Sequence, residues 1–266
     1  MSEHEFEEPG DAVQRERHGS VLVASINRPS KGNSISHAVI SALDELASDL
    51  EEETSEPDGP RALVLAGLGG KAFSAGADIH DLDGVSGSQA RQQMQRGQRV
   101  FDRLEQLPMV VIAAISGYAL GGGLELAMAA DLRIADPDAK LGQPEISLAN
   151  LPGWGGTQRL PRLVGLGRAV EMILTGDTID ANRAFEIGLV NQIAPNPLAA
   201  ALDLATTVSA RSPIAVKGAK RAIHAGLDCG MREGLSVEAD AVAACCETAA
   251  QRAAVRTFLE RKRRQA

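Results

Sequence analysis

Two glutamates stand almost alone in segments that carry little charge. Glu125 is the only Asp, Glu, Lys or Arg within residues 115–130, and Glu145 is the only one within 141–158. A buried carboxylate without a partner is costly, and burial raises its pKa. Two such groups can divide the roles of proton donor and proton acceptor in general acid/base catalysis. The alternative, a helix-start residue or a salt-bridged anchor at each position, fits the spacing equally well.

Glycines stand where backbone N–H groups could face a ligand. Gly121-Gly122-Gly123 follows an apolar stretch and opens a helical pattern, and the turn Ser74-Ala75-Gly76-Ala77 also follows a predicted strand. Two backbone donors aimed at one oxygen form an oxyanion hole, in which one donor is worth about 2.7–4 kcal/mol in the transition state. The structural alternative is a tight strand-to-helix turn or close helix packing. Neither segment fits a phosphate loop or a dinucleotide fingerprint.

Other chemistries lack the necessary residues. The histidines at positions 4, 18, 37, 80 and 224 are scattered, so we expect no metal site. Ser74 has neither a GxSxG setting nor a placed His/Asp partner. The three cysteines, two of them adjacent, predict neither disulfides nor zinc. Trp154 and Tyr118 are the only Trp and Tyr, and we interpret each as a packing residue or a pocket wall.

The elements that would position these groups alternate along the chain. Short apolar runs predict buried strands, and the 3.6-residue repeat predicts helices between them, which is typical of an α/β fold with parallel pairing. We expect residues 1–18 to be polar and loose at the tip, and the stretch after residue 140 to be rich in loops. The expected strands are 20–27, 62–67 and 110–115; the expected helices are 36–53 with Ser36 as cap, 88–107, modest helices from about 167, 181–187, 197–210, 213–225, 234–246 and 250–264. We therefore predict a core over 1–196 and a helical region over 197–266.

The overall charge and hydropathy exclude several partners. The formal net charge is −8, which disfavours nucleic acid as a partner. Residues 110–130 approach the length of a bilayer span, but the three glycines and Glu125 argue against a membrane segment. The N-terminus shows no signal-peptide pattern. We expect a cytoplasmic protein with no membrane partner.

Five segments, in order, resemble the crotonase superfamily of enoyl-CoA hydratases and isomerases. They are GKAFSAGADIHDL, AAISGYALGGGLELAMAADLRIA, AKLGQPEISLANLPGWGGTQRLPRLVG, TGDTIDANRAFEIGLVNQIAP and SPIAVKGAKRAI. The resemblance implies a spiral of ββα units with a helical C-terminal region that drives assembly into a homotrimer or a dimer of trimers. It also implies a coenzyme A thioester as substrate and no separate cofactor.

Site residues follow from the resemblance position by position. The N–H groups of Ala77 and Gly122 would hold the thioester oxygen, while Glu125 and Glu145 match the two positions that are glutamate in hydratases. As a hypothesis, Glu125 deprotonates the water and Glu145 delivers the α-proton. The CoA side would be bound by Arg28, Ala75 (main chain, at the adenine), Asp78 and Ile79, joined by Phe258 and Arg261 from the C-terminal block. His80 departs from the family's usual lysine near the CoA.

The resemblance favours hydration of a trans-2-enoyl-CoA to a 3-hydroxyacyl-CoA, as in fatty-acid β-oxidation. An enoyl-CoA isomerase is the nearest alternative, but such relatives generally need one catalytic carboxylate, and this chain keeps both. A non-catalytic CoA-binding protein is the alternative from another class. The acids at 125 and 145 argue against it.

Overall fold

The computed structural model describes residues 12–54 and 58–265. Contacts between Cα atoms divide the chain into two compact units, with the division between Thr206 and Thr207. Helix α7 (Pro197–Ser209) runs across this division. The boundary expected after residue 196 therefore remains a prediction about where the core ends.

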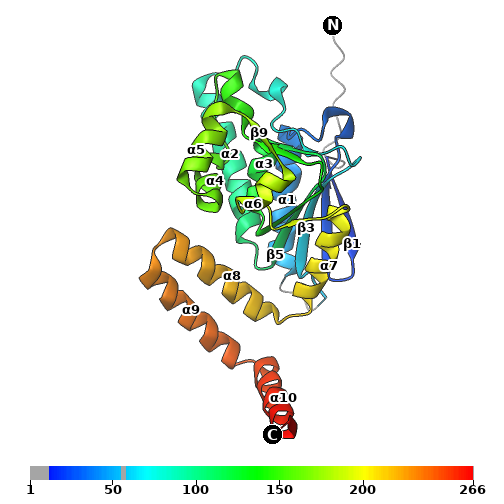
Figure 1. Cartoon of the computed structure of the whole chain (residues 1–266), viewed down its shortest axis with the longest axis vertical. Coiled ribbons are helices and arrows are strands. Elements are labelled where there is room, and N and C mark those ends of the chain that lie inside the picture. The colour runs from blue at the N-terminus through cyan, green and yellow to red at the C-terminus, as the bar shows by residue number, and fades with distance from the viewer. Residues whose placement is uncertain (1–11, 55–57, 266) are drawn as a thin grey trace. The chain divides into compact units, whose positions relative to one another are not determined.

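The strands of the described residues form two sheets in the first unit (Figure 1). One sheet has the order β1-β2-β3-β5-β7-β10 and the other β4-β6-β8-β9. All neighbours are parallel except β1, which pairs antiparallel with β2, and β9, which pairs antiparallel with β8. The bounds are β1 Val13–His18, β2 Val21–Ile26, β3 Ala62–Gly67, β4 Ala72–Ser74, β5 Val110–Ile115, β6 Tyr118–Leu120, β7 Leu132–Ala135, β8 Lys140–Gly142, β9 Thr178–Asp180 and β10 Gln192–Ile193. The parallel pairing predicted from the sequence is confirmed.

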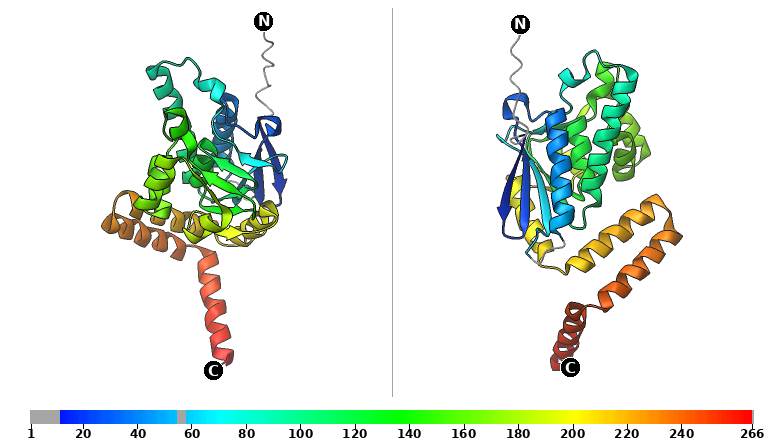
Figure 2. Two further views of the ribbon diagram at one scale, coloured as in Figure 1. Left: turned by 45° about the horizontal axis from the view of Figure 1, so that its top comes forward. Right: turned by 180° about the vertical axis from the view of Figure 1, so that it is seen from behind.

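Three successive units repeat the same pattern of two strands and a helix. Each unit gives one strand to the first sheet and one to the second before its helix, so the chain winds as a spiral. The units are β3-β4-α2 (Gly87–Gln106), β5-β6-α3 (Gly122–Ala129) and β7-β8-α4 (Gly156–Val164). Figure 2 shows helices of the first compact unit lying along one side of its strands. The ββα spiral that the resemblance implies is confirmed.

Local sequence explains most of these elements. Helix α1 (His37–Glu53) begins after Ser36, whose side chain accepts a hydrogen bond from Val39 N–H. Helix α2 begins with a capping box formed by Ser86 and Gln89. Strand β5 is buried along its whole length, as its unbroken apolar run predicts.

Two elements of the first unit differ from the expectation. The segment 1–18 is expected to be polar and loose at its tip, and residues 1–11 lie outside the described residues. Residues 13–18 form the edge strand β1, which the sequence analysis missed because its exposed polar residues hide the strand pattern. The stretch after residue 140, expected to be mostly loop until about 167, contains helix α4 from Gly156. Its glycine start and the internal Pro161 are turn signals that mask the helical repeat. The remaining helices here are α5 (Leu166–Thr175) and α6 (Ala181–Glu186).

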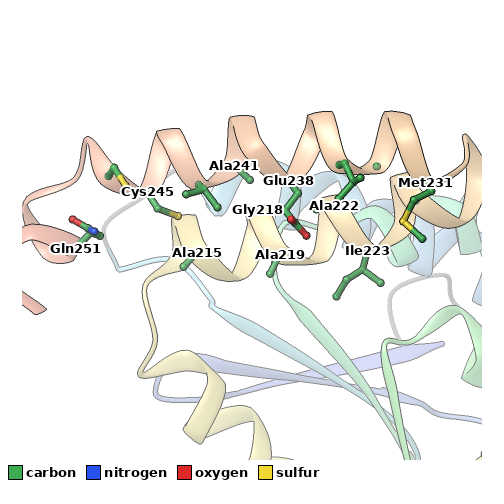
Figure 3. A pocket seen from close by; sticks show the side chains of 15 residues that line it. Ala215, Gly218, Ala219, Ala222, Ile223, Met231, Glu238, Ala241, Cys245 and Gln251 are labelled. Atoms are coloured by element: carbon green, nitrogen blue, oxygen red, sulfur yellow. The ribbon is translucent and has the colours of Figure 1, made fainter. Parts of the chain in front are cut away.

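The second unit is helical, as predicted. It contains α8 (Pro213–Asp228), α9 (Met231–Cys246) and α10 (Ala249–Gln265). Helices α8 and α9 lie side by side, and the groove between them has a volume of about 640 Å³ (Figure 3). Small or apolar side chains such as Ala219, Ala222 and Val242 line this groove. Over the described ranges, no helix combines the length and apolar character needed to cross a membrane.

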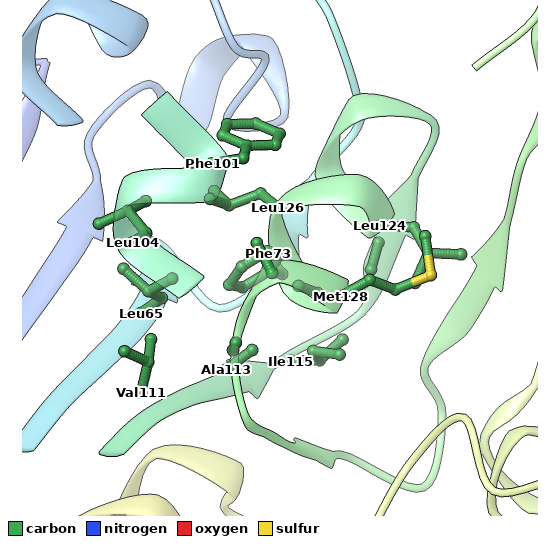
Figure 4. Close-up of a cluster of buried hydrophobic side chains, with 14 of the residues drawn as sticks. Leu65, Phe73, Phe101, Leu104, Val111, Ala113, Ile115, Leu124, Leu126 and Met128 are labelled. Carbon is green, nitrogen blue, oxygen red and sulfur yellow. The ribbon is translucent and has the colours of Figure 1, made fainter. Parts of the chain in front are cut away.

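Helix α3 lies in the hydrophobic core of the first unit. Every residue from Gly122 to Ala129 is buried, and Leu124, Leu126 and Met128 join side chains from β3, β5 and α2 (Figure 4). A helix that is apolar on all sides must be enclosed by other elements. The single carboxylate of this helix is therefore enclosed with it.

Candidate active site

Glu125 is the buried carboxylate of helix α3. It lies in the first turn and is 1% exposed. The helix begins after Gly121, which has a φ of 50° and a ψ of −126°. Residues other than glycine rarely adopt this backbone conformation. This turn lets the chain pass from strand β6 directly into a buried helix, so Glu125 is carried into the interior on a rigid element.

Two backbone donors hold the Glu125 side chain. The N–H groups of Trp154 and Gly156 both donate to Oε1, each at 2.7 Å. Burial raises the pKa of Glu125 to about 7, and the nearby charge of Glu145 adds to this rise. The two N–H groups and the charge of Arg159 act in the opposite direction. The carboxyl is thus fixed in place and poised to exchange a proton near neutral pH.

Glu145 lies beside the turn that opens α3. It sits in the first turn of the 3-10 helix η4 (Pro144–Leu148) and is half-buried. A Cβ atom on Gly121 would lie only 2.9 Å from Glu145 Oε1, so the carboxylate packs against the backbone there. Burial raises the pKa of Glu145. The structure therefore brings both acids to the N-terminal end of α3.

Gln143 is a site residue that the sequence reasoning missed. Its side chain is completely buried, and its amide nitrogen, when turned toward Glu145, donates to both carboxylate oxygens at 3.1 and 3.2 Å. The segment 141–158, uncharged apart from Glu145, contains three amides, Gln143, Asn150 and Gln158, and no local pattern marks Gln143 as the one that binds Glu145. Such a fork fixes the orientation of the carboxylate.

The Ala77 backbone nitrogen lies close to Gly122. A Cβ atom on Gly122 would be 3.3 Å from Ala77 N. The bridge between Ile35 and Ala77 uses the Gly76 carbonyl and the Asp78 N–H, and so leaves the Ala77 N–H out. As the first residue of α3, Gly122 has no intrahelical acceptor for its N–H. Two donors can thus approach one oxygen at the end of α3 where the acids lie.

Arg28 and Asp78, expected on the CoA side, form a buried ion pair. Arg28 Nη1 lies 2.9 Å from Asp78 Oδ2 and also donates to the Ser34 carbonyl at 2.9 Å. Burial acts to raise the pKa of Asp78, but the hydrogen bond and charge of Arg28 bring it below its ordinary value. This pair fixes the turn that carries Ala77. Ala75, Ile79 and His80 are exposed beside it.

The other candidates divide between the two units. Phe258 and Arg261 are exposed residues of α10 in the second unit, and their contact with CoA stays a prediction. The buried Ser74 hydroxyl accepts a hydrogen bond from Gly76 N–H, which gives it a structural part in the turn. Tyr118 is half-exposed on β6. Across 12–54 and 58–265, no group of three His, Cys, Asp or Glu side chains could hold a metal ion.

An ion pair holds the segment that binds Glu125. Arg159 pairs with Glu105 of α2 and donates to the Trp154 carbonyl at 3.1 Å. Both members are largely buried, so the segment from Trp154 to Gly156 is fixed to α2 on one side and to Glu125 on the other. The site thus combines two fixed acids with the backbone N–H groups of Ala77 and Gly122.

Comparison with known proteins identifies relatives of this chain. A family model described as enoyl-CoA hydratase/isomerase matches residues 16–265. The chain is 40% identical to the short-chain-enoyl-CoA hydratase of Clostridium acetobutylicum, over 93% of this chain and 94% of the relative. It is also 40% identical to the crotonyl-CoA hydratase of Syntrophomonas wolfei, over 93% and 95%. The crystal structure of enoyl-CoA hydratase from Bacillus anthracis matches with a TM-score of 0.88 at 38% identity, covering 94% of this chain and 96% of that chain.

Proposed function

Because the chain belongs to the enoyl-CoA hydratase/isomerase family, we propose that Glu125 and Glu145 are the acid/base pair of an enoyl-CoA hydratase. The enzyme adds water across the 2,3-double bond of an enoyl-CoA thioester and gives a 3-hydroxyacyl-CoA. The observation that supports these two roles is the placement of two carboxyls with raised pKa values at the end of α3 that also presents the Ala77 and Gly122 N–H groups.

The two N–H groups polarise the substrate. When the thioester oxygen accepts hydrogen bonds from Ala77 and Gly122, negative charge that develops on it is stabilised as an enolate. Polarisation makes the β-carbon electrophilic and the α-carbon basic. Because both donors are backbone groups on fixed elements, they need no rearrangement during the reaction.

The two acids supply the proton transfers. Glu125 Oε1 is occupied by the Trp154 and Gly156 N–H groups, so Oε2 is the oxygen that takes a proton from water. The hydroxyl oxygen bonds to the β-carbon, and protonated Glu145 gives its proton to the α-carbon. One proton is gained by Glu125 and one is lost by Glu145, so a proton passing between them restores the starting state.

The isomerase alternative uses less of this site. Moving a double bond needs one group that removes and returns a proton, whereas hydration needs a base for water and an acid for carbon. Gln143, with its amide turned toward Glu145, orients that carboxylate, and the Trp154 and Gly156 N–H groups orient Glu125. A site that holds both acids in fixed orientation favours hydration.

The wider setting is part of the same proposal. The substrate is an acyl-CoA thioester, bound without a separate cofactor beside Arg28, Ala75, Asp78 and Ile79. The enzyme acts in the cytoplasm in fatty-acid β-oxidation. Its C-terminal helices assemble into a homotrimer or a dimer of trimers, which is supported by large apolar side chains exposed on α8 and α9, namely Ile223, Leu227, Met231 and Leu235.

Turnover of two isomeric substrates tests the function. We expect wild type to remove the enoyl-thioester absorbance of trans-2-butenoyl-CoA and to form 3-hydroxybutyryl-CoA. A 3-enoyl-CoA should be converted much more slowly. Glu125→Gln and Glu145→Gln should each suppress hydration while keeping the circular dichroism spectrum of wild type. Faster conversion of the 3-enoyl substrate, or full hydration by either variant, would contradict the assignment.

A further inference from the structure

The Trp154 side chain is wedged between helices α2 and α3. It is 7% exposed and packs edge-on against Phe101, with ring centroids 5.6 Å apart at 70°. A Cβ atom on Gly97 of α2 would lie 2.4 Å from the indole Nε1, and one on Gly122 of α3 would lie 2.5 Å from its Cζ3. Only glycine at both positions leaves room for the indole.

The indole adjoins the reacting groups. The ring packs against Gly122, whose N–H is one of the two proposed oxyanion donors. The backbone N–H of Trp154 donates to Glu125. A substrate whose carbonyl oxygen meets Ala77 and Gly122 therefore places the first carbons of its acyl chain next to this ring.

A small cavity lies at this point. It has a volume of about 20 Å³. Its apolar lining is Trp154, Ala77, Ile35, Ile40, Leu82 and Met94, and its polar lining is Ser36, His37, Asp78, Asp81, Gln93 and Arg96. Leu82 and Asp81 belong to η3 (Ile79–Leu82). A volume of this size holds about one water-sized group. Beyond its double bond, a butenoyl chain carries one methyl group, which matches that space.

The buried indole N–H lowers the stability of the fold. Within the described part of the chain, Trp154 Nε1 is buried and has no hydrogen-bond partner. A buried N–H without an acceptor destabilises the fold, and a packing role alone would be met by an apolar ring. The size of the indole in this place is what a smaller apolar side chain could not reproduce.

We propose that the Trp154 indole closes the acyl cavity and restricts the enzyme to short, four-carbon enoyl chains. The inference rests on the proposed function, because it concerns the substrate of the same site. Trp154 acts here as a specificity-determining residue that contacts the end of the acyl chain.

Chain-length profiles test the proposal. Wild type, Trp154→Ala and Trp154→Leu are assayed with trans-2-enoyl-CoA substrates of four, six, eight and ten carbons. We expect the ratio of kcat/KM for ten carbons over four to rise by at least about tenfold in Trp154→Ala, since each added methylene changes pocket recognition by about tenfold or more. Trp154→Leu leaves a smaller opening and should raise the six-carbon ratio most.

A matched control distinguishes the effect of the indole on chain length from the effect of a destabilised core. Phe101 packs behind Trp154 and is completely buried, but it does not line the cavity. Phe101→Leu should therefore lower stability and leave the chain-length profile as in wild type. An equal shift in Phe101→Leu and Trp154→Ala would overturn the proposal.

Fluorescence gives a second reading that needs no variant. Trp154 is the only tryptophan of the chain, so its emission reports this site alone. Saturating butyryl-CoA should change the emission, whereas free CoA should leave it nearly unchanged. Butyryl-CoA that binds by calorimetry with no change in emission would overturn the proposal.

The outcomes distinguish the hydratase activity from the role of Trp154. Failure of wild type to hydrate any enoyl-CoA would remove the proposed function. Hydration of butenoyl-CoA with identical chain-length profiles in wild type, Trp154→Ala and Trp154→Leu would remove the role of Trp154 and leave the function intact.

Discussion

Two hollows in the described part of the molecule differ in size and in chemistry. The groove between α8 and α9 has a volume of about 640 Å³, and the cavity beside Trp154 has about 20 Å³. The large groove is lined mostly by small and apolar residues, with the exposed Glu238 as its acid. The small cavity is lined in part by Trp154, whose ring packs against Gly122 and whose backbone N–H donates to Glu125.

We infer from this difference that burial and fixed donors, and not volume, distinguish the proposed site. Glu125 has lost its water and keeps two backbone donors, and burial raises its pKa to about 7. Glu238 lies in contact with solvent on α9.

Removing one acid from each region gives the largest contrast. Glu125→Gln keeps the shape and still accepts from the Trp154 and Gly156 N–H groups, but it cannot take a proton. We expect kcat to fall by about 10²–10⁴. Glu238→Gln is the matched change and should alter kcat by no more than about twofold, as for other exposed substitutions. Steady-state hydration of trans-2-butenoyl-CoA measures both values of kcat. Similar losses in the two variants would contradict a special role for Glu125.

The pH dependence of turnover sharpens the same contrast. Glu125 must be ionised to accept a proton from water, and burial raises its pKa to about 7. Below that pH, kcat/KM should fall about tenfold for each pH unit as the carboxyl becomes protonated. Trp154→Ala admits water beside Glu125, so its acid limb should move to lower pH. A flat profile between pH 5 and 8 would contradict a basic role for Glu125.

The buried carboxyl of Glu125 should also make the free energy of unfolding depend on pH. The pKa of Glu125 rises from 4.5 to about 7 on folding. The neutral acid therefore favours the folded state fully below pH 4.5, and this contribution is lost as the pH rises to about 7. Relative to Glu125→Gln, wild type should lose about 3 kcal/mol of unfolding free energy across this window.

Urea unfolding at pH 4.5, 6 and 8 measures this difference. Glu238→Gln serves again as the control and should remain parallel to wild type, because its carboxylate is exposed in the fold. A constant gap between wild type and Glu125→Gln at all three pH values would show that Glu125 is not desolvated.

Much of this fold follows from local sequence patterns. Unbroken apolar runs identify β3 and β5 because both faces of a parallel strand are buried. Polar edge residues hide β1, since its hydrogen bonds to β2 do not require apolar side chains. Turn residues hide α4, because a helix stabilised by tertiary packing tolerates glycine and proline in a short span.

The candidate site divides in the same way. Glu125 and Glu145 are visible in the sequence because they interrupt segments without charge. Gln143 is not visible, because an uncharged amide gives no such contrast, and its part depends on a contact with Glu145 that only folding creates. The wedge of Trp154 between Gly97 and Gly122 joins residues from three separate segments, and no local pattern signals it.

The smallest predicted effect concerns two glycines of α2. Gly97→Ala places a methyl group 2.4 Å from the indole and should cost about 1–3 kcal/mol through overpacking. Gly87→Ala meets nothing within 4 Å and should leave stability unchanged or raise it by up to about 1 kcal/mol. Urea unfolding measures both changes.

The double variant Gly97→Ala with Trp154→Ala decides where the cost of the first substitution arises. If the indole is the obstacle, its removal opens the space that the new methyl group needs, and the two substitutions should be far from additive. Additive losses would place the strain in the α2 backbone instead. In that case, the close fit of Trp154 between α2 and α3 would no longer explain why the cavity beside Trp154 is small.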